Sequence, residues 1–285
     1  AVNPDAQERG PEVSLRVAQT GTKVAEEEAL LRLLALRGEL LEQVERDAAR
    51  SAFLLRTVEQ ALLGRFTERE AAGFAYLRDR IAAEPNPSLR LILRTILRRF
   101  EQIAAEGVRV KAGERLYFYQ KYIIHEIRAL RAQGAPGVVL ALEQGLGKTV
   151  IALELLNGQP AVILTPNPVV SSWVEQAAKF MPEPTMTDLE GSYASRDRAL
   201  AHLTKPHVVT NIEYTRQMPL RRAALLSRPD GMLVVDEADY LGSPTSQQAQ
   251  GTRQLQAQFT LLSTATPFKR AGQIPYFLEI FNRDP

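Results

Sequence analysis

The feature that most constrains the fold is a glycine-rich loop between an apolar run and a helix-compatible run. The loop spans residues 145–149 (GLGKT), follows the apolar run Val138–Glu143 and precedes Val150–Leu156. Glycine permits turns in which backbone N–H groups point inward, and the N-terminus of a following helix adds partial positive charge. This order predicts a strand, an anion-binding loop and a helix. The strict consensus for such anion-binding loops has a glycine five positions before the position of Gly147, where this chain has Leu142.

Each residue of the loop suits a nucleotide phosphate. Gly145, Leu146 and Gly147 offer backbone N–H groups, Lys148 reaches the terminal phosphates, and the hydroxyl of Thr149 can hold Mg²⁺. A simple tight connection is the alternative, but the Lys-Thr pair and the flanking elements favour nucleotide binding. The loop therefore predicts ATP and Mg²⁺ as cofactors.

A second motif is a carboxylate pair after an apolar strand. Asp236 and Glu237 follow the run Leu233–Val235 and precede Ala238 and Asp239. Parallel sheets bind ligands at the carboxyl ends of their strands, so Asp236 and the glycine loop should share one edge. There Asp236 can bind the Mg²⁺ shell through water while Glu237 polarises the attacking water. The alternative is two solvated acids at a strand end.

Short apolar runs alternate with helical stretches after Gly107, which predicts an α/β lobe with a parallel sheet covered on both faces. The predicted strands are Val138–Glu143, Ala161–Thr165, His207–Thr210, Met232–Asp236 and Phe259–Ser263. We assign this lobe to residues 111–285.

The preceding part of the chain has a different composition and a different hydrophobic periodicity. Residues 23–110 are rich in Leu, Ala, Glu and Arg with apolar residues at helical spacing, which predicts an all-α domain of three to five helices. Breaks are expected near Gly38, at Gly64 to Thr67 and at Glu84 to Pro87. Residues 1–22 have no clear period and are predicted to be a flexible lead-in.

Composition excludes several kinds of site. The chain has no cysteine and three histidines, which leaves little for disulfides, thiol catalysis or a zinc centre. Its formal net charge of +2 is too balanced to indicate nucleic acid from charge alone. No apolar run approaches the ~18 residues of a membrane helix, so we expect no membrane partner and a cytoplasmic location.

Together the motifs resemble those of superfamily 2 helicases. The loop resembles motif I, the run from Asp236 resembles motif II, and Thr264, Ala265 and Thr266 resemble motif III, which couples the nucleotide site to the track. Residues 143–149 (EQGLGKT) are similar to the signature of Swi/Snf-type helicase-like ATPases, with Leu142 where that family has Asp.

Further positions agree with this resemblance. Tyr119 and Gln120 resemble the element that reads adenine. The run from Thr165-Pro166 through Trp173 to Phe180 resembles motif Ia, and Thr210-Asn211 resembles motif Ib. By resemblance, residues 111–285 form the first RecA-like, P-loop lobe of a translocase that moves on double-stranded DNA, with Pro166, Thr210 and Asn211 as candidate DNA contacts.

The resemblance also implies a second RecA-like lobe, which we expect to lie outside these 285 residues. An arginine supplied from outside is typically worth about 10³ to 10⁵ in the rate of phosphoryl transfer, so the isolated chain is expected to bind ATP and to hydrolyse it poorly. In this hypothesis Lys148, Asp236 and Glu237 are the catalytic residues. The helical domain would dock on the lobe or recruit a protein partner.

Two other functions remain open on the sequence. The chain could be a non-hydrolysing, ATP-switched binding module, or the lobe of a DEAD-box-like RNA helicase or restriction-type motor, since residues 236–239 spell that box (DEAD). Trp173 is expected to pack in the core rather than stack on a base. The stripe Arg90, Arg94 and Arg98 is expected to be a solvated helix face, and the three histidines receive no role.

Overall fold

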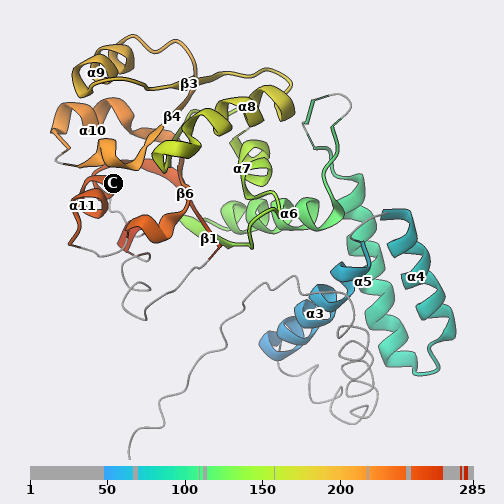
Figure 1. Ribbon diagram of the computed structural model, residues 1–285. Coiled ribbons are helices and arrows are strands. Elements are labelled where there is room, and N and C mark those ends of the chain that lie inside the picture. Colours follow the sequence, from blue (N-terminus) through green and yellow to red (C-terminus); the bar gives the residue numbers. More distant parts are fainter. Residues whose placement is uncertain are drawn as a thin grey trace, which may run out of the picture.

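The structure is a computed structural model, shown in Figure 1. The described residues are 48–66, 70–108, 110–111, 114–156, 158–216, 218–241, 245–265, 277 and 279–281. The predicted lead-in, the break near Gly38 and the motif III residue Thr266 lie outside them.

Within the described residues, the predicted helical domain contains three α-helices. They are α3 (Ala48–Leu63), α4 (Glu70–Ala83) and α5 (Pro87–Ala105), with the 3-10 turn η1 (Gly64–Phe66) after α3. The predicted breaks after Gly64 and at Glu84 to Pro87 are confirmed. The Asn86 side chain caps α5 by accepting hydrogen bonds from the backbone N–H groups of Ser88 and Leu89, and Pro87 suits the first helical position because it lacks an N–H.

The buried faces of these helices form one apolar cluster, called here the helical cluster. It contains Val58, Leu62, Leu63, Phe66, Phe74, Leu77, Ile81, Leu89, Leu93, Ile96, Phe100 and Ile103, together with Phe118 and Tyr122 of the next helix. That next helix, α6 (Phe118–Ala132), already lies within the predicted nucleotide lobe. The proposed boundary near residue 110 therefore falls in the connection between α5 and α6, and apolar packing crosses it.

The rest of the chain forms a six-stranded parallel sheet with helices on both faces (Figure 1). The strands are β1 (Gly137–Ala141), β2 (Ala161–Thr165), β3 (Met186–Asp188), β4 (His207–Asn211), β5 (Arg228–Val235) and β6 (Ala257–Thr264), in the order β1-β6-β5-β2-β4-β3. The helices after α6 are α7 (Lys148–Leu156), α8 (Val170–Phe180), α9 (Tyr193–Ala201), α10 (Leu220–Leu226) and α11 (Gln247–Arg253). The predicted α/β class is confirmed.

Side chains of the central strands alternate between two apolar clusters. Ile163 and Val234 pack with α6, α7 and α8 on one face, whereas Val162 and Leu233 pack with α9, α10 and α11 on the other. Both faces are covered, which is why these strands read as continuous apolar runs instead of alternating ones.

Two features of the sheet differ from the sequence prediction. The edge strand β3 was not predicted, because a three-residue segment with one buried side chain carries no apolar run. Strand β5 begins at Arg228, four residues before the predicted start, since its first residues are polar. In the part of the chain that the structure describes, no helix is long and apolar enough to cross a membrane.

The topology brings three motifs to one edge of the sheet. Strand β6 lies between β1 and β5 and pairs with both in parallel register. The glycine loop follows β1, Asp236 follows β5, and Thr264 ends β6. The residues resembling motifs I, II and III therefore leave three adjacent strands at the same edge.

One close backbone approach depends on a glycine. Helix α11 lies against the 3-10 turn η3 (Ile212–Thr215), and a Cβ at Gly251 would meet the backbone oxygen of Thr215 at 1.8 Å. We expect Gly251→Ala to destabilise the fold by about 3 kcal/mol, because backbone must move to relieve the overlap. Gly107→Ala, where a Cβ meets nothing within 4 Å, is the matched control. Equal unfolding free energies of the two variants in chemical denaturation would contradict this packing.

Candidate nucleotide site

The glycine loop forms a turn that only glycine adopts readily. Gly145 and Gly147 have φ angles of 82° and 79°, and α7 begins directly afterwards at Lys148. The Lys148 ammonium is buried and donates a hydrogen bond of 3.0 Å to the backbone oxygen of Leu142. The Leu142 side chain packs in the apolar cluster under the loop, so the position where a strict loop has glycine serves as a core residue here.

The N-terminus of α6 holds this loop from the side. The Tyr119 hydroxyl donates to the backbone oxygen of Leu146 at 2.9 Å, and Gln120 Nε2 contacts the same oxygen at 3.3 Å. Gln120 Oε1 in turn accepts from the backbone N–H of Tyr117 at 2.9 Å. Gly147 must lack a side chain here, because a Cβ would lie 2.3 Å from Gln120 Nε2. The structure thus brings the predicted adenine-reading residue and the loop into contact.

Asp236 is buried and accepts hydrogen bonds from four groups. Its Oδ2 accepts from Trp173 Nε1 at 3.0 Å and from Thr165 Oγ1 at 3.2 Å. Its Oδ1 accepts from the backbone N–H of Glu237 at 3.1 Å and from Ser263 Oγ at 3.3 Å. A buried carboxylate is costly unless its oxygens accept hydrogen bonds. Here two other strands and one helix supply three of the donors, and the backbone N–H of the next residue supplies the fourth.

Trp173 packs in the core, as expected, with 1% of its surface exposed. No residue spacing indicated that its indole N–H would donate a hydrogen bond to the Asp236 carboxylate. A tryptophan on a helix that covers the sheet is usually interpreted as packing alone, and only the tertiary structure reveals its polar partner.

Backbone strain marks the next residue. Glu237 has a φ of 48°, and among the described residues it is the one non-glycine with a positive φ. This left-handed conformation costs roughly 1–2 kcal/mol for a residue with a Cβ. It lies at the turn that follows β5, directly after Asp236.

Motifs II and III are also linked directly. The Thr264 hydroxyl donates to the Asp239 carboxylate at 3.4 Å, and Ser263 contacts Asp236. Ala265 follows at the end of β6. Thr149 is the second residue of α7 and half-buried, at the edge of the sheet that also carries Asp236.

The three residues predicted to contact nucleic acid lie at the carboxyl ends of the paired strands β2 and β4, but they are buried: Pro166 follows β2, and Thr210 and Asn211 end β4. Thr210 is fully buried, and its Oγ1 has no hydrogen-bond partner in the described structure. Asn211 donates from Nδ2 to Asn167 Oδ1 at 2.8 Å, and Pro166 is buried beside it. Asn167 is exposed, so it presents this pair to solvent. The sequence analysis missed Asn167, which no spacing singles out.

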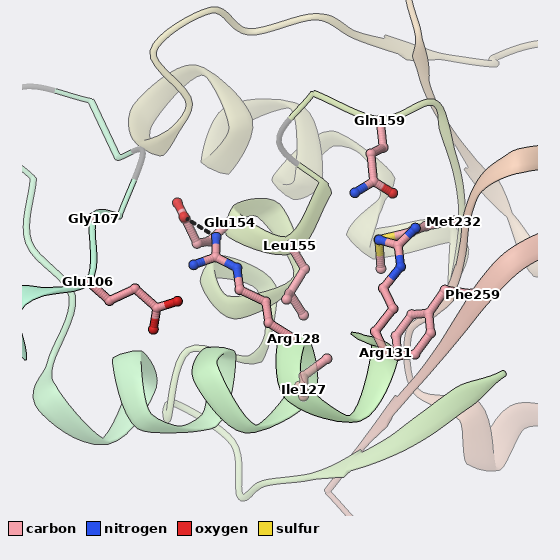
Figure 2. A pocket seen from close by; sticks show the side chains of 10 residues that line it. All are labelled: Glu106, Gly107, Ile127, Arg128, Arg131, Glu154, Leu155, Gln159, Met232 and Phe259. Carbon is pink, nitrogen blue, oxygen red and sulfur yellow. Dashed lines mark hydrogen bonds and ion pairs between the residues drawn. The ribbon is translucent and has the colours of Figure 1, made fainter. Parts of the chain in front are cut away.

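A separate cavity of about 360 Å³ lies at the opposite edge of the sheet, between α6 and α7 (Figure 2). Met232 of β5, Phe259 of β6 and Gln159, which lies just before β2, line it, and Arg128 on α6 forms an ion pair with Glu154 on α7 at 2.8 Å. Because the glycine loop and Asp236 follow the opposite strand ends, this cavity is distinct from the nucleotide site.

These features define the class of protein: a RecA-like lobe with a glycine loop and an acidic motif after neighbouring parallel strands. The family of SNF2-related domains matches residues 119–282, more than half of the chain. The chain therefore belongs to this family, in agreement with the resemblance of its motifs.

Curated relatives share part of the chain. It is 29% identical over 168 residues to the mouse DNA excision repair protein ERCC-6-like, covering 54% of this chain and 13% of that protein. It is 31% identical over 180 residues to the RNA polymerase-associated protein RapA of Pasteurella multocida, covering 57% of this chain and 18% of RapA. The chain thus spans less than a fifth of the length of these two relatives.

Solved structures agree in fold. The Sulfolobus solfataricus SWI2/SNF2 ATPase core domain has a TM-score of 0.53 at 20% identity, covering 64% of this chain and 37% of that one. The same core in complex with dsDNA has a TM-score of 0.50 at 22% identity, covering 62% of this chain and 36% of that one. At this identity the likeness shows the fold.

The bond from Trp173 to Asp236 has a testable consequence. We expect Trp173→Phe to weaken nucleotide binding about tenfold when Mg²⁺ is present and much less in EDTA, because a group that orients a metal-site carboxylate affects the metal-dependent part of affinity. Competition with a fluorescent ATP analogue measures both affinities. Tyr193→Phe, which removes a remote hydroxyl bonded to the backbone of Glu213, is the control. Equal loss with and without Mg²⁺ would mean that Trp173 matters only for packing.

Proposed function

We propose that this chain is the ATP-binding first lobe of a DNA-dependent ATPase of Snf2 type, which couples MgATP hydrolysis to movement on double-stranded DNA when a second RecA-like lobe completes the site. The observation that carries the proposal is the convergence of the glycine loop, Asp236 and Thr264 at one edge of three adjacent strands. The family match and the dsDNA bound to a Snf2-type core of the same fold support it.

The phosphates would lie along the loop and the N-terminus of α7. The backbone N–H groups of residues 145–147 and the helix N-terminus favour negative charge. Lys148 would leave the Leu142 oxygen, its present acceptor, and neutralise the terminal phosphates. Gln120, held at the loop by Leu146, would read the adenine edge.

The residues present fit a magnesium ion. Thr149 offers a hydroxyl and Asp236 a carboxylate, and hard oxygen donors of this kind are those that Mg²⁺ prefers. Both oxygens of Asp236 already accept two hydrogen bonds each, which suits contact through a metal-bound water rather than direct ligation. The bond from Ser263, at 3.3 Å the longest of the four, is the one such a water would replace most easily. When bound, Mg²⁺ neutralises charge on the transferred phosphoryl group.

Glu237 would orient and polarise the attacking water. Glu237 has a left-handed backbone conformation and directly follows Asp236. In this proposal the two neighbouring carboxylates have different roles. Thr264, which belongs to motif III, and its neighbour Ser263 are bonded to Asp239 and Asp236. Through these bonds motif III would couple the state of the phosphate to the nucleic-acid track. We propose Asn167 as the exposed part of the DNA contact at the ends of β2 and β4, with its hydrogen-bond partner Asn211 and the buried Pro166 and Thr210 supporting it.

The loop lysine gives the first prediction. We expect Lys148→Ala to abolish MgATP binding, because the charge that neutralises the terminal phosphates is lost from a buried position. Equilibrium binding of a fluorescent ATP analogue measures this, with Lys179→Ala on α8 as a control that removes a lysine outside the loop. Unchanged nucleotide affinity in Lys148→Ala would refute the nucleotide site.

The second prediction concerns hydrolysis. We expect Glu237→Gln to keep MgATP affinity within about twofold and to stop phosphate release in the two-lobed enzyme, because the amide cannot polarise water as the carboxylate does. Phosphate release is measured with no nucleic acid, with duplex DNA and with RNA, and Lys148→Ala serves as the blank. Stimulation by RNA and not by duplex DNA would replace the proposed track, whereas ATP-dependent partner binding without turnover would favour a switched binding module.

The same assay applied to the 285-residue chain tests the need for a second lobe. We propose that its turnover lies near the level of the blank, because the external arginine contributes about 10³ to 10⁵ in rate. Brisk DNA-stimulated turnover by this chain alone would contradict that part of the proposal.

A further inference from the structure

Helix α6 is packed on two sides. One side, with Tyr119, Ile123 and Ile127, belongs to the apolar cluster on the sheet. The other side inserts Phe118 and Tyr122 into the helical cluster. The Phe118 ring lies 4.5 Å from that of Phe66 and 5.1 Å from that of Phe100, measured between ring centroids, with several rings tilted or edge-on as aromatic clusters prefer.

Polar tethers reinforce this second side. Glu59 on α3 is 0% exposed and accepts a 2.8 Å hydrogen bond from the Tyr122 hydroxyl and a 3.2 Å ion-paired bond from Arg99 on α5. Arg99 also bonds Glu126, one turn further along α6. Arg99 lies beside the predicted basic stripe, yet it faces the lobe, whereas Arg94 and Arg98 are exposed.

A buried carboxylate specifies one docking geometry. Burial raises the pKa of the Glu59 carboxyl, and the Tyr122 hydroxyl and the Arg99 guanidinium oppose that rise. Displacing α6 along its axis would leave Glu59 buried without these partners, which is a strongly unfavourable state. These contacts therefore disfavour displacement of α6 relative to α3 and α5.

The tether closest to the nucleotide site is an ion pair in the first turn of α6. Lys121 Nζ lies 2.8 Å from Glu70 Oε2 at the start of α4, and both side chains are partly buried. Lys121 directly follows Gln120, whose amide contacts the glycine loop at the Leu146 oxygen. The residue that pairs with α4 is therefore the direct sequence neighbour of the residue proposed to contact adenine.

We infer that the helices α3 to α5 are a positioning element for the nucleotide base: through Lys121–Glu70 and Tyr122–Glu59 they fix the N-terminal turn of α6 so that Gln120 selects adenine over guanine. This inference rests on the proposed function. It assigns Lys121 and Tyr122 as positioning residues that act through Gln120 and do not touch the nucleotide themselves. It also gives the helical part of the chain a role in ATP recognition beyond recruiting a partner.

The test is base selectivity, measured as the ratio of dissociation constants for GTP and ATP in Mg²⁺. Lys121→Met and Tyr122→Phe each keep most of the packing surface and remove one tether. We expect each variant to lower the ratio about three- to tenfold, the range for one hydrogen bond or ion pair that positions a recognition group. Lys121→Arg keeps the charge and should retain the wild-type ratio.

The matched control is Arg78→Met, which removes an ion pair between α4 and α5 at 2.8 Å without touching α6. It should leave the ratio unchanged. General destabilisation lowers the folded fraction and weakens both nucleotides equally, so the ratio separates positioning from stability. In addition, Lys121→Met made on a Gln120→Ala background should change the ratio no further, because the tether acts through Gln120.

The outcomes distinguish the two proposals. Wild-type selectivity in Lys121→Met and Tyr122→Phe, with wild-type binding of ATP, would overturn the inference and leave the proposed function intact. A wild-type chain that binds neither nucleotide would overturn the proposed function and the inference with it. A wild-type chain that binds ATP and GTP equally would overturn the inference alone, because Gln120 would then have no selectivity to position.

Discussion

The arrangement of the site depends on the buried carboxylate of Asp236. Hydrogen bonds from Thr165 on β2, Trp173 on α8 and Ser263 on β6 converge on its two oxygens. Each donor comes from a different element, so the carboxylate is satisfied only when the sheet and α8 are assembled together. The same interaction thus stabilises the fold at the carboxyl edge and orients the group proposed to act on the metal shell.

A second buried carboxylate organises the junction between the helices α3 to α5 and the helix α6. Glu59 on α3 joins Tyr122 and Arg99, and the aromatic cluster around Phe118 surrounds this joint with apolar contacts. Packing alone would tolerate small shifts between helices, whereas an unpaired buried charge would not. The helical part of the chain is therefore fixed to the helix that carries Gln120, and its packing is continuous with that of the nucleotide lobe.

Much of the fold could be predicted because its signals are local. The turn at Gly145 to Gly147, the apolar strands and the breaks around Pro87 depend on residue type and spacing within a few positions. Strand β3 escaped prediction because Met186–Asp188 is ordered mainly by pairing with β4, which lies far along the chain. The bonds from Trp173 and the exposure of Asn167 escaped for the same reason, since both depend on long-range contacts.

The sequence by itself determined which chemistry the chain carries: a glycine loop with Lys148 and Thr149, the acidic pair Asp236 and Glu237, and the order of strands and helices around them. These follow from backbone conformational preference, charge and periodicity, which act locally. Only the tertiary structure decided that β6 lies between the strands that carry the loop and the acidic motif, and that the Trp173 indole donates to Asp236. It also decided that α3 and α4 form polar contacts with α6. Those choices depend on which buried polar groups find partners, and partners are brought together by folding rather than by position in the chain.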